Sequence, residues 1–233
     1  MARRRFAGRT RRARAARRRR LFYAFGTAAV LLALVWRTWF AHPPAPSPDL
    51  PPDRFLPVYL RAAQANDVPW QLLAAINAVE TNYNRVRPMV SPAGALGPMQ
   101  FMPATWREYG VDVLHPRKRG NPMNFLDAVF ASARLLHRWG MTDSPARTRA
   151  RWIAHIAGAY NAGPGAWNNS SAETVHYRAA VVRLFFLIRR DVRIPAADVR
   201  YWRRLPLARI AAAAAGALPL YPPGYPPVRH AGR

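Results

Sequence analysis

The chain contains no cysteine and few acidic residues. Without cysteine it can form neither disulfides nor thiolate metal sites, and it cannot use a cysteine nucleophile. Its 11 Asp and Glu face 36 Lys and Arg, which gives a formal net charge of +25. So large a positive charge favours polyanionic surroundings, which include nucleic acid, anionic lipid and an anionic cell wall.

The chain also lacks the apolar–polar alternation of β-strands, and it contains no internal repeat. Apolar residues instead recur at helical spacing, which predicts a mainly α domain over residues 54–195. The alanine-rich and then proline-rich segment 196–233 is expected to form a flexible tail. One predicted helix begins at Asp67, and the others span residues 103–109, 124–140, 144–161 and 170–190.

Local patterns predict where these helices begin. Asp67 is expected as an N-cap, with Pro69 in the first turn of its helix. Gly110 is expected to end the helix that Pro103 opens. Two pairs match the capping box, in which side chains bind free amides of the first turn: Asn124 with Asp127, and Ser170 with Glu173.

Three segments precede this domain. Residues 1–20 hold 11 arginines and no acidic residue, residues 21–41 are apolar apart from Arg37, and residues 42–53 are rich in proline. About 20 apolar residues suffice to cross a bilayer as a helix, and arginines before such a helix keep the N-terminus in the cytoplasm. We therefore expect a transmembrane signal-anchor helix over 21–41 in the inner (cytoplasmic) membrane. The proline-rich linker would then hold the domain on the periplasmic or extracytoplasmic side. Two alternatives stay open: a signal peptide cleaved near Ala41, and a helix buried in a soluble core.

Glutamate is scarce, and one glutamate stands out. The chain has three, of which Glu108 is expected at the surface and Glu173 in a capping box. Glu80 extends the apolar stripe of its helix, four residues after Ile76. Desolvation and the negative end of the helix dipole both raise the pKa of a carboxyl placed there. A general acid near neutral pH needs such a carboxyl. The alternative is a half-exposed glutamate at a helix end.

Two segments carry motifs. Residues 80–105 read ETNYNRVRPMVSPAGALGPMQFMPAT, and residues 159–167 read AYNAGPGAW. In order and spacing they resemble three motifs of the soluble lytic transglycosylase (SLT) family, and the similarity covers most of residues 65–170. The resemblance implies a lysozyme-like, all-α fold with Glu80 at the bottom of a long glycan groove.

By the same resemblance, the reaction is non-hydrolytic cleavage of the β-1,4 bond between N-acetylmuramic acid and N-acetylglucosamine in peptidoglycan. Glu80 first protonates the glycosidic oxygen. It then accepts a proton from the muramyl C6 hydroxyl, which closes on C1 and gives a 1,6-anhydro end. Glycoside cleavage usually takes two carboxyl groups, but here the substrate supplies the nucleophile. No cofactor or metal is expected.

The resemblance also implies residues that bind the glycan. The amide of Gln100 suits an N-acetyl group, and the hydroxyl of Tyr160 is expected near Glu80. Two alternatives stay open. Tyr160 is then a buried tyrosine with a satisfied hydroxyl, and Met102 serves only core packing. The Glu173–Tyr177 pattern is similar to a fourth family motif. The substrate-binding residues expected are Ser91, Gln100, Met102, Tyr160, Asn161 and Tyr177.

Three features depart from the family pattern. Thr81 stands where a serine usually follows the glutamate, and the interval from Glu80 to Ser91 is longer than in the commonest members. Some relatives also continue into an aspartate-rich, calcium-like loop. Here residues 113–122 are basic, and Asp112 is the only carboxylate beside them, so we predict no metal in this loop.

Other functions remain as alternatives. A lysozyme-type muramidase would use water in place of the C6 hydroxyl, and a catalytically weak module would only bind peptidoglycan within an envelope assembly. A nucleic-acid binder is disfavoured, because the chain has a predicted anchor and no recognisable reading motif. The expected partners are peptidoglycan glycan strands and the membrane. Five basic residues either meet anionic peptide stems and wall polymers or are solvated loop charge: Arg85, Arg87, Arg117, Lys118 and Arg119.

Overall fold

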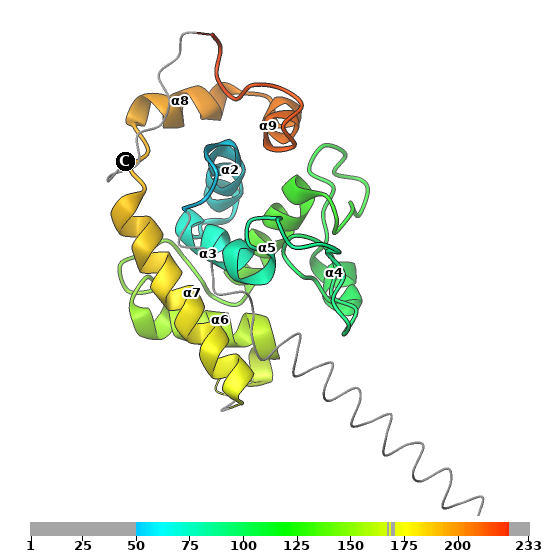
Figure 1. Ribbon diagram of the computed structural model, residues 1–233, viewed down its shortest axis with the longest axis vertical. Helices are drawn as coiled ribbons and strands as arrows, with labels where there is room; N and C mark the ends of the chain where they lie inside the picture. Colours follow the sequence, from blue (N-terminus) through cyan, green and yellow to red (C-terminus); the bar gives the residue numbers. More distant parts are fainter. Residues whose placement is uncertain (1–49, 167, 169–170, 224–233) are drawn as a thin grey trace, which may run out of the picture. The chain divides into compact units, whose positions relative to one another are not determined.

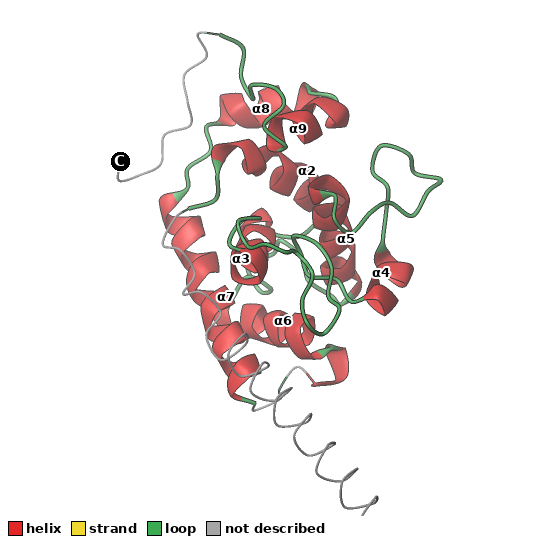
Figure 2. Ribbon diagram, turned by 45° about the vertical axis from the view of Figure 1, so that its right-hand side comes forward, coloured by secondary structure: helices red, strands yellow, loops and turns green. Residues whose placement is uncertain are grey.

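The computed structural model describes residues 50–166, 168 and 171–223, which form eight α-helices, two short 3-10 helices and isolated β-bridges (Figures 1 and 2). The mainly α prediction is confirmed for this part of the chain. The elements are η1 (Asp53–Phe55), α2 (Leu56–Asn66), α3 (Trp70–Thr81), α4 (Pro103–Tyr109), α5 (Phe125–Arg138), α6 (Ala150–Ala162), η2 (Pro164–Ala166), α7 (Ala172–Asp191), α8 (Ala196–Arg204) and α9 (Leu207–Ala214).

The predicted basic segment 1–20, the predicted anchor helix 21–41 and most of the linker 42–53 lie outside the described residues. Within the described part of the chain, no helix is both long and apolar enough to cross a membrane.

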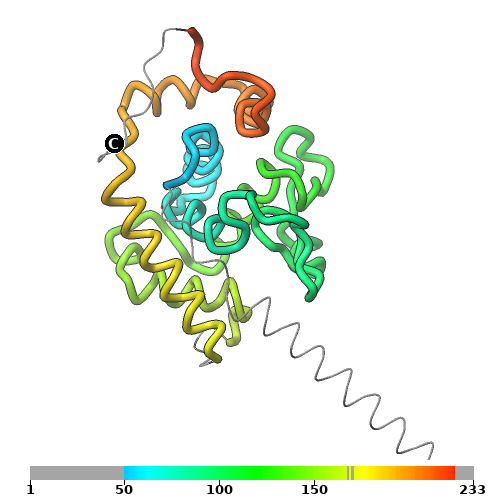
Figure 3. The backbone as a smooth tube through the Cα atoms, in the orientation of Figure 1, coloured from blue at the N-terminus to red at the C-terminus, as the bar shows by residue number. Residues whose placement is uncertain are grey.

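Helix α3 lies at the centre of the fold. Residues 72–78 of α3 are all buried, and a helix that is apolar on nearly every face must be covered on every side. It packs against α2, α5 and α7, while α6 lies along α7 (Figures 1 and 3). The C-terminal end of this central helix carries Glu80.

The predicted start of α3 is wrong. Asp67 ends α2 in the left-handed conformation, with φ of 50° and its backbone N–H bonded to the Ala63 carbonyl. Pro69 precedes the first turn, which begins at Trp70. Aspartate tolerates the left-handed region better than most residues, and the residue before a proline is disfavoured in a helix. The Asp67–Pro69 pattern therefore separates two helices.

The starts of α6 and α7 also differ from the prediction. Residues 144–148 form a turn in which the amides of Arg147 and Thr148 bond to the Ser144 carbonyl, and α6 begins only at Ala150. The N-cap of α7 is Ser171, whose Oγ accepts from the Thr174 amide at 3.2 Å. Ser170 itself lies outside the described residues.

Two other local predictions hold. Helix α4 spans the predicted residues and ends at Gly110. Asn124 caps α5 and accepts from the Asp127 amide at 3.2 Å. The Asp127 carboxylate does not close the capping box, however, because it accepts from the amides of Val113 and Asn121.

Residues 196–204 and 207–214 are helical, where the sequence predicted a flexible tail. Trp202 of α8 and Ile210 of α9 are buried in the core. Arg61 of α2 donates to three carbonyls at the end of α8, those of Trp202, Arg203 and Leu205. The Trp202 carbonyl also accepts from the Leu205 amide at 3.3 Å, and the last carbonyls of a helix commonly need such partners from outside it. The helical fold therefore continues past residue 195.

Candidate active site

Glu80 occupies the last turn of α3 and is partly exposed. Its Oε1 accepts a hydrogen bond of 2.6 Å from the hydroxyl of Tyr177, a residue of α7 that lies 97 positions later. The packing of α7 on α3 brings the two together. A hydrogen bond this short is typical of a hydroxyl donating to a carboxylate.

Burial raises the pKa of Glu80 from its ordinary value to about 7. The Tyr177 hydrogen bond opposes this rise because it stabilises the charged form, and the negative charge of Glu173 adds to it. Near neutral pH, Glu80 is therefore present in both its protonated and its charged form. A group with this pKa can donate a proton in one step and accept one in the next.

Tyr160 of α6 holds the loop beside Glu80. Its hydroxyl donates to the Met99 carbonyl at 2.8 Å and lies 3.1 Å from the Ser132 hydroxyl of α5. Burial raises the pKa of Tyr160 above its ordinary value, and the charge of Glu80 adds to this rise. Tyr160 is thus electrostatically coupled to Glu80, but the hydroxyl that bonds Glu80 is that of Tyr177.

Asn161 joins the end of α6 to the first turn of α7. Its Oδ1 accepts from the Thr174 hydroxyl at 2.9 Å, and its Nδ2 donates to Glu173 at 3.4 Å. Glu173 thus contacts α6, and the predicted capping box of Ser170 with Glu173 lies partly outside the described residues. These bonds fix α7 at the end that also carries Tyr177.

Residues 57–181, more than half of the chain, match the family model of the transglycosylase SLT domain. The chain belongs to this family. No curated protein and no solved structure matches the chain. At the family level, this membership indicates a lytic transglycosylase that binds peptidoglycan. The second half of α7 and the helices α8 and α9 lie beyond the matched residues.

The loop between α3 and α4 of the SLT domain carries Ser91, Gln100 and Met102. Ser91 Oγ accepts from the Ala95 amide at 3.0 Å, and Gln100 Nε2 donates to the Gly97 carbonyl at 2.8 Å. Both polar side chains are partly buried and bond within the loop, whereas Met102 is 44% exposed. The structure therefore brings Tyr177 into contact with Glu80 and Tyr160 into contact with Met99, while Ser91 and Gln100 make their described bonds within the loop.

Gly97 allows this loop of the SLT domain to approach the segment before α5. With φ of 76°, it lies so close that a Cβ atom would come within 1.8 Å of the Pro122 carbonyl oxygen. Only glycine adopts this conformation without strain and leaves that space free.

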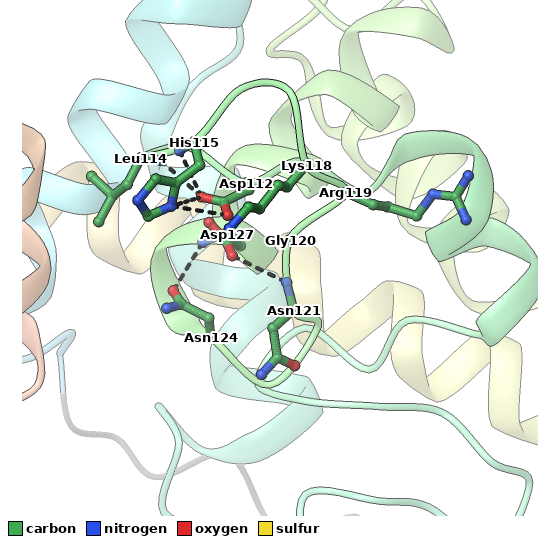
Figure 4. A pocket seen from close by; sticks show the side chains of 9 residues that line it. All are labelled: Asp112, Leu114, His115, Lys118, Arg119, Gly120, Asn121, Asn124 and Asp127. Atoms are coloured by element: carbon green, nitrogen blue, oxygen red, sulfur yellow. Dashed lines mark hydrogen bonds and ion pairs between the residues drawn. The ribbon is translucent and has the colours of Figure 1, made fainter.

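A hollow of about 440 Å³ lies in the SLT domain beside the basic segment that precedes α5 (Figure 4). Asp112 accepts there from the His115 amide at 2.8 Å and from its ring Nδ1, and Asp127 accepts from two backbone amides. These carboxylates hold the loop in shape. Among the residues that the structure describes, no group of three His, Cys, Asp or Glu is placed to hold a metal ion.

The sequence did not predict roles for three polar residues that the structure shows bonded around the loop before α4: Asn77, Asn84 and Ser132. Asn77 and Ser132 are fully buried. One signal was available for Asn77, which is a polar residue inside an otherwise apolar helix, one turn before Glu80.

Proposed function

We propose that this SLT-domain protein is a lytic transglycosylase that cleaves the β-1,4 bond between N-acetylmuramic acid and N-acetylglucosamine without water. The product is a 1,6-anhydro-N-acetylmuramic acid end. One observation carries the proposal: Glu80 is a partly exposed carboxyl at the end of a buried helix, and burial raises its pKa to about 7.

Protonated Glu80 would donate its proton to the glycosidic oxygen as the bond from that oxygen to C1 breaks. The resulting carboxylate would accept the proton of the C6 hydroxyl as the C6 oxygen bonds to C1. The proton count balances, since the first step consumes the proton that the second returns. The substrate supplies the nucleophile, so the scheme needs no second catalytic carboxylate.

Tyr177 would fix the geometry of both steps. Its hydroxyl occupies Oε1 of Glu80, which leaves Oε2 for the glycosidic oxygen and later for the C6 hydroxyl. Tyr160 would act indirectly by positioning the loop, because its hydroxyl donates to the Met99 carbonyl next to Gln100. Ser91, Gln100, Met102 and Asn161 stay proposed glycan contacts.

The place of action is part of the proposal. An anchor over residues 21–41 would hold the domain at the inner or cytoplasmic membrane, on its periplasmic or extracytoplasmic side. The substrate would be peptidoglycan glycan strands, and basic surface residues would contact anionic wall polymers.

The test is mass spectrometry of muropeptides released from purified sacculi by the full-length protein in mild detergent. The wild type should release products lighter by one water than hydrolytic ones, and Glu80→Gln should release none. Glu108→Gln is the matched control, because Glu108 is exposed on α4, and it should match the wild type.

Two other outcomes would each replace the proposal. Reducing ends would identify a hydrolytic muramidase on the same site. No release by a folded wild type that still binds sacculi would identify a binding module. The Tyr177–Glu80 hydrogen bond favours an active enzyme over such a module.

A further inference from the structure

Asn77 is fully buried in α3, among apolar residues and one turn before Glu80. The reaction scheme assigns it no task. An amide buried without hydrogen bonds costs about 2–7 kcal/mol. The partners of Asn77 therefore show what the residue does.

These partners lie on four separate parts of the chain. Asn77 Oδ1 accepts from the Tyr59 hydroxyl of α2 at 2.6 Å. Its Nδ2 lies 3.1 Å from Thr81 Oγ1, 2.9 Å from Asn84 Oδ1 and 2.8 Å from the Pro98 carbonyl. Three acceptors thus share the two hydrogens of one amide. One side chain joins α2, the end of α3, the turn after it and the loop before Gln100.

The turn after α3 needs such support. Asn82, Tyr83 and Asn84 have φ of 48°, 54° and 66°, which makes three consecutive left-handed residues. This conformation costs roughly 1–2 kcal/mol for each ordinary residue and persists only where neighbouring groups enforce it. The Asn77 amide holds Asn84 Oδ1, and Thr81 Oγ1 accepts from the Asn84 amide at 3.3 Å.

The loop before α4 is held at two consecutive carbonyls. Asn77 and Thr81 donate to the Pro98 carbonyl at 2.8 and 2.9 Å, and Tyr160 donates to the Met99 carbonyl at 2.8 Å. The first pair belongs to the helix that carries Glu80. The position of Glu80 relative to Gln100 therefore depends on these bonds.

We propose that Asn77 is a positioning residue, which sets Glu80 against the loop before α4 through Thr81, Asn84 and Pro98. It touches no reacting atom. The inference rests on the proposed function of Glu80 and adds the group that holds its helix end in register with the loop. A displacement of about 1 Å in such a site can lower the rate by about 100-fold.

The test uses two substitutions that keep the number of non-hydrogen atoms in the side chain. Asn77→Leu removes the amide, and Thr81→Val removes the hydroxyl that shares the Pro98 carbonyl. The control is Thr148→Val, which removes a buried hydroxyl that donates to the Ser144 carbonyl in the turn before α6. Thr81→Ser is the conservative variant, since it keeps the hydroxyl.

The measurement is kcat and KM of full-length variants on soluble, uncrosslinked glycan strands, at a temperature well below each Tm. Asn77→Leu and Thr81→Val should lower kcat by about 10- to 100-fold with little change in KM. The double variant should lose no more than the worse single variant, because both act on one carbonyl. Thr148→Val should lower Tm but leave kcat unchanged, and Thr81→Ser should retain most of the activity.

The inference is overturned if folded Thr81→Val keeps the kcat of the wild type, or if kcat falls as much in Thr148→Val as in Thr81→Val. Should Asn77→Leu fail to fold, Thr81→Val against Thr81→Ser decides alone. A wild type that releases no anhydro ends rejects the proposed function and the inference together. If the wild type is active and folded Asn77→Leu and Thr81→Val keep its kcat, the inference is rejected and the proposed function stands.

Discussion

Burial and the Tyr177 hydrogen bond shift the proton affinity of Glu80 in opposite directions. Burial raises its pKa to about 7, and the Tyr177 hydroxyl limits the rise by stabilising the charged form. Each influence makes a separate prediction.

The first prediction concerns stability. The pKa of Glu80 is about 7 in the folded protein against an ordinary value of 4.5, so the folded state binds more protons between these pH values. The contribution of Glu80 to the free energy of unfolding is fully present below pH 4.5 and is lost as the pH rises through about 7. Glu80→Gln does not lose this contribution, because glutamine stays uncharged at every pH. It should raise the free energy of unfolding by up to about 3 kcal/mol at pH 8 and change it little at pH 4.5.

Calorimetric Tm values of wild type, Glu80→Gln and Glu108→Gln at both pH values check this. Equal Tm differences for Glu80→Gln at pH 4.5 and pH 8 would contradict the raised pKa. Glu108→Gln is the control, because Glu108 is exposed on α4.

The second prediction concerns Tyr177→Phe. The substitution removes a hydrogen bond to a charged group, which is worth about 1.5–3 kcal/mol. The pKa of Glu80 should rise by about one unit or more, and the pH–rate profile should move upward with it. A profile at the wild-type position, with only the rate reduced, would mean that Tyr177 serves packing alone.

At the scale of elements, two contacts decide how segments fit together. Arg61 holds the end of α8 against α2, and Gly97 lets the loop before α4 lie against Pro122. Both can be tested with a matched pair of variants.

The third prediction concerns Arg61→Met. The substitution keeps an unbranched apolar stem but removes the guanidinium that donates to the carbonyls of Trp202, Arg203 and Leu205. The free energy of unfolding should fall by about 1–3 kcal/mol, and amide exchange should rise first in α8 and α9. Arg200→Met is the control, because Arg200 is an exposed residue of α8. Uniform exchange changes across all helices would argue against a local role.

The fourth prediction compares two glycines. Alanine at Gly94, with φ of 84° and no atom within 4 Å of a Cβ, should cost only the conformational strain of about 1–2 kcal/mol. Alanine at Gly97 adds a collision with the Pro122 carbonyl oxygen, so its loss should be clearly larger. Urea unfolding measures both. Equal losses would show that the loop moves aside without penalty.

At the scale of the whole molecule, the formal charge of +25 matters most. Exposed basic residues attract polyanions over a distance that salt shortens to about 8 Å at physiological ionic strength. A densely negative partner should therefore be attracted to the protein, and an uncharged glycan should not.

The fifth prediction follows from that charge. Binding of the Glu80→Gln variant to sacculi should weaken when salt rises from low to high concentration. Binding to chitin, an uncharged glycan, should change little. Salt-independent binding to sacculi would mean that the basic residues are solvated and contact no wall polymer.

The sequence by itself determined the helical class, the family and the ends of elements that depend on neighbours in the chain. The motifs at residues 80–105 and 159–167 identified the family, and Asn124 and Gly110 marked helix ends. Caps are local hydrogen-bonding patterns, so short stretches of sequence sufficed at these two positions. The same local patterns misplaced the starts of α3, α6 and α7.

Only the tertiary structure decided the contacts between distant residues. It placed the Tyr177 hydroxyl on Glu80, brought four segments to Asn77 and packed residues 196–214 onto the core. Alanine-rich sequence is compatible with a helix or a tail, and burial of Trp202 chose between them. Such outcomes depend on which helix faces pack against each other. The packing energy comes from pairs of residues that lie far apart in the chain, so no short stretch of sequence contains it.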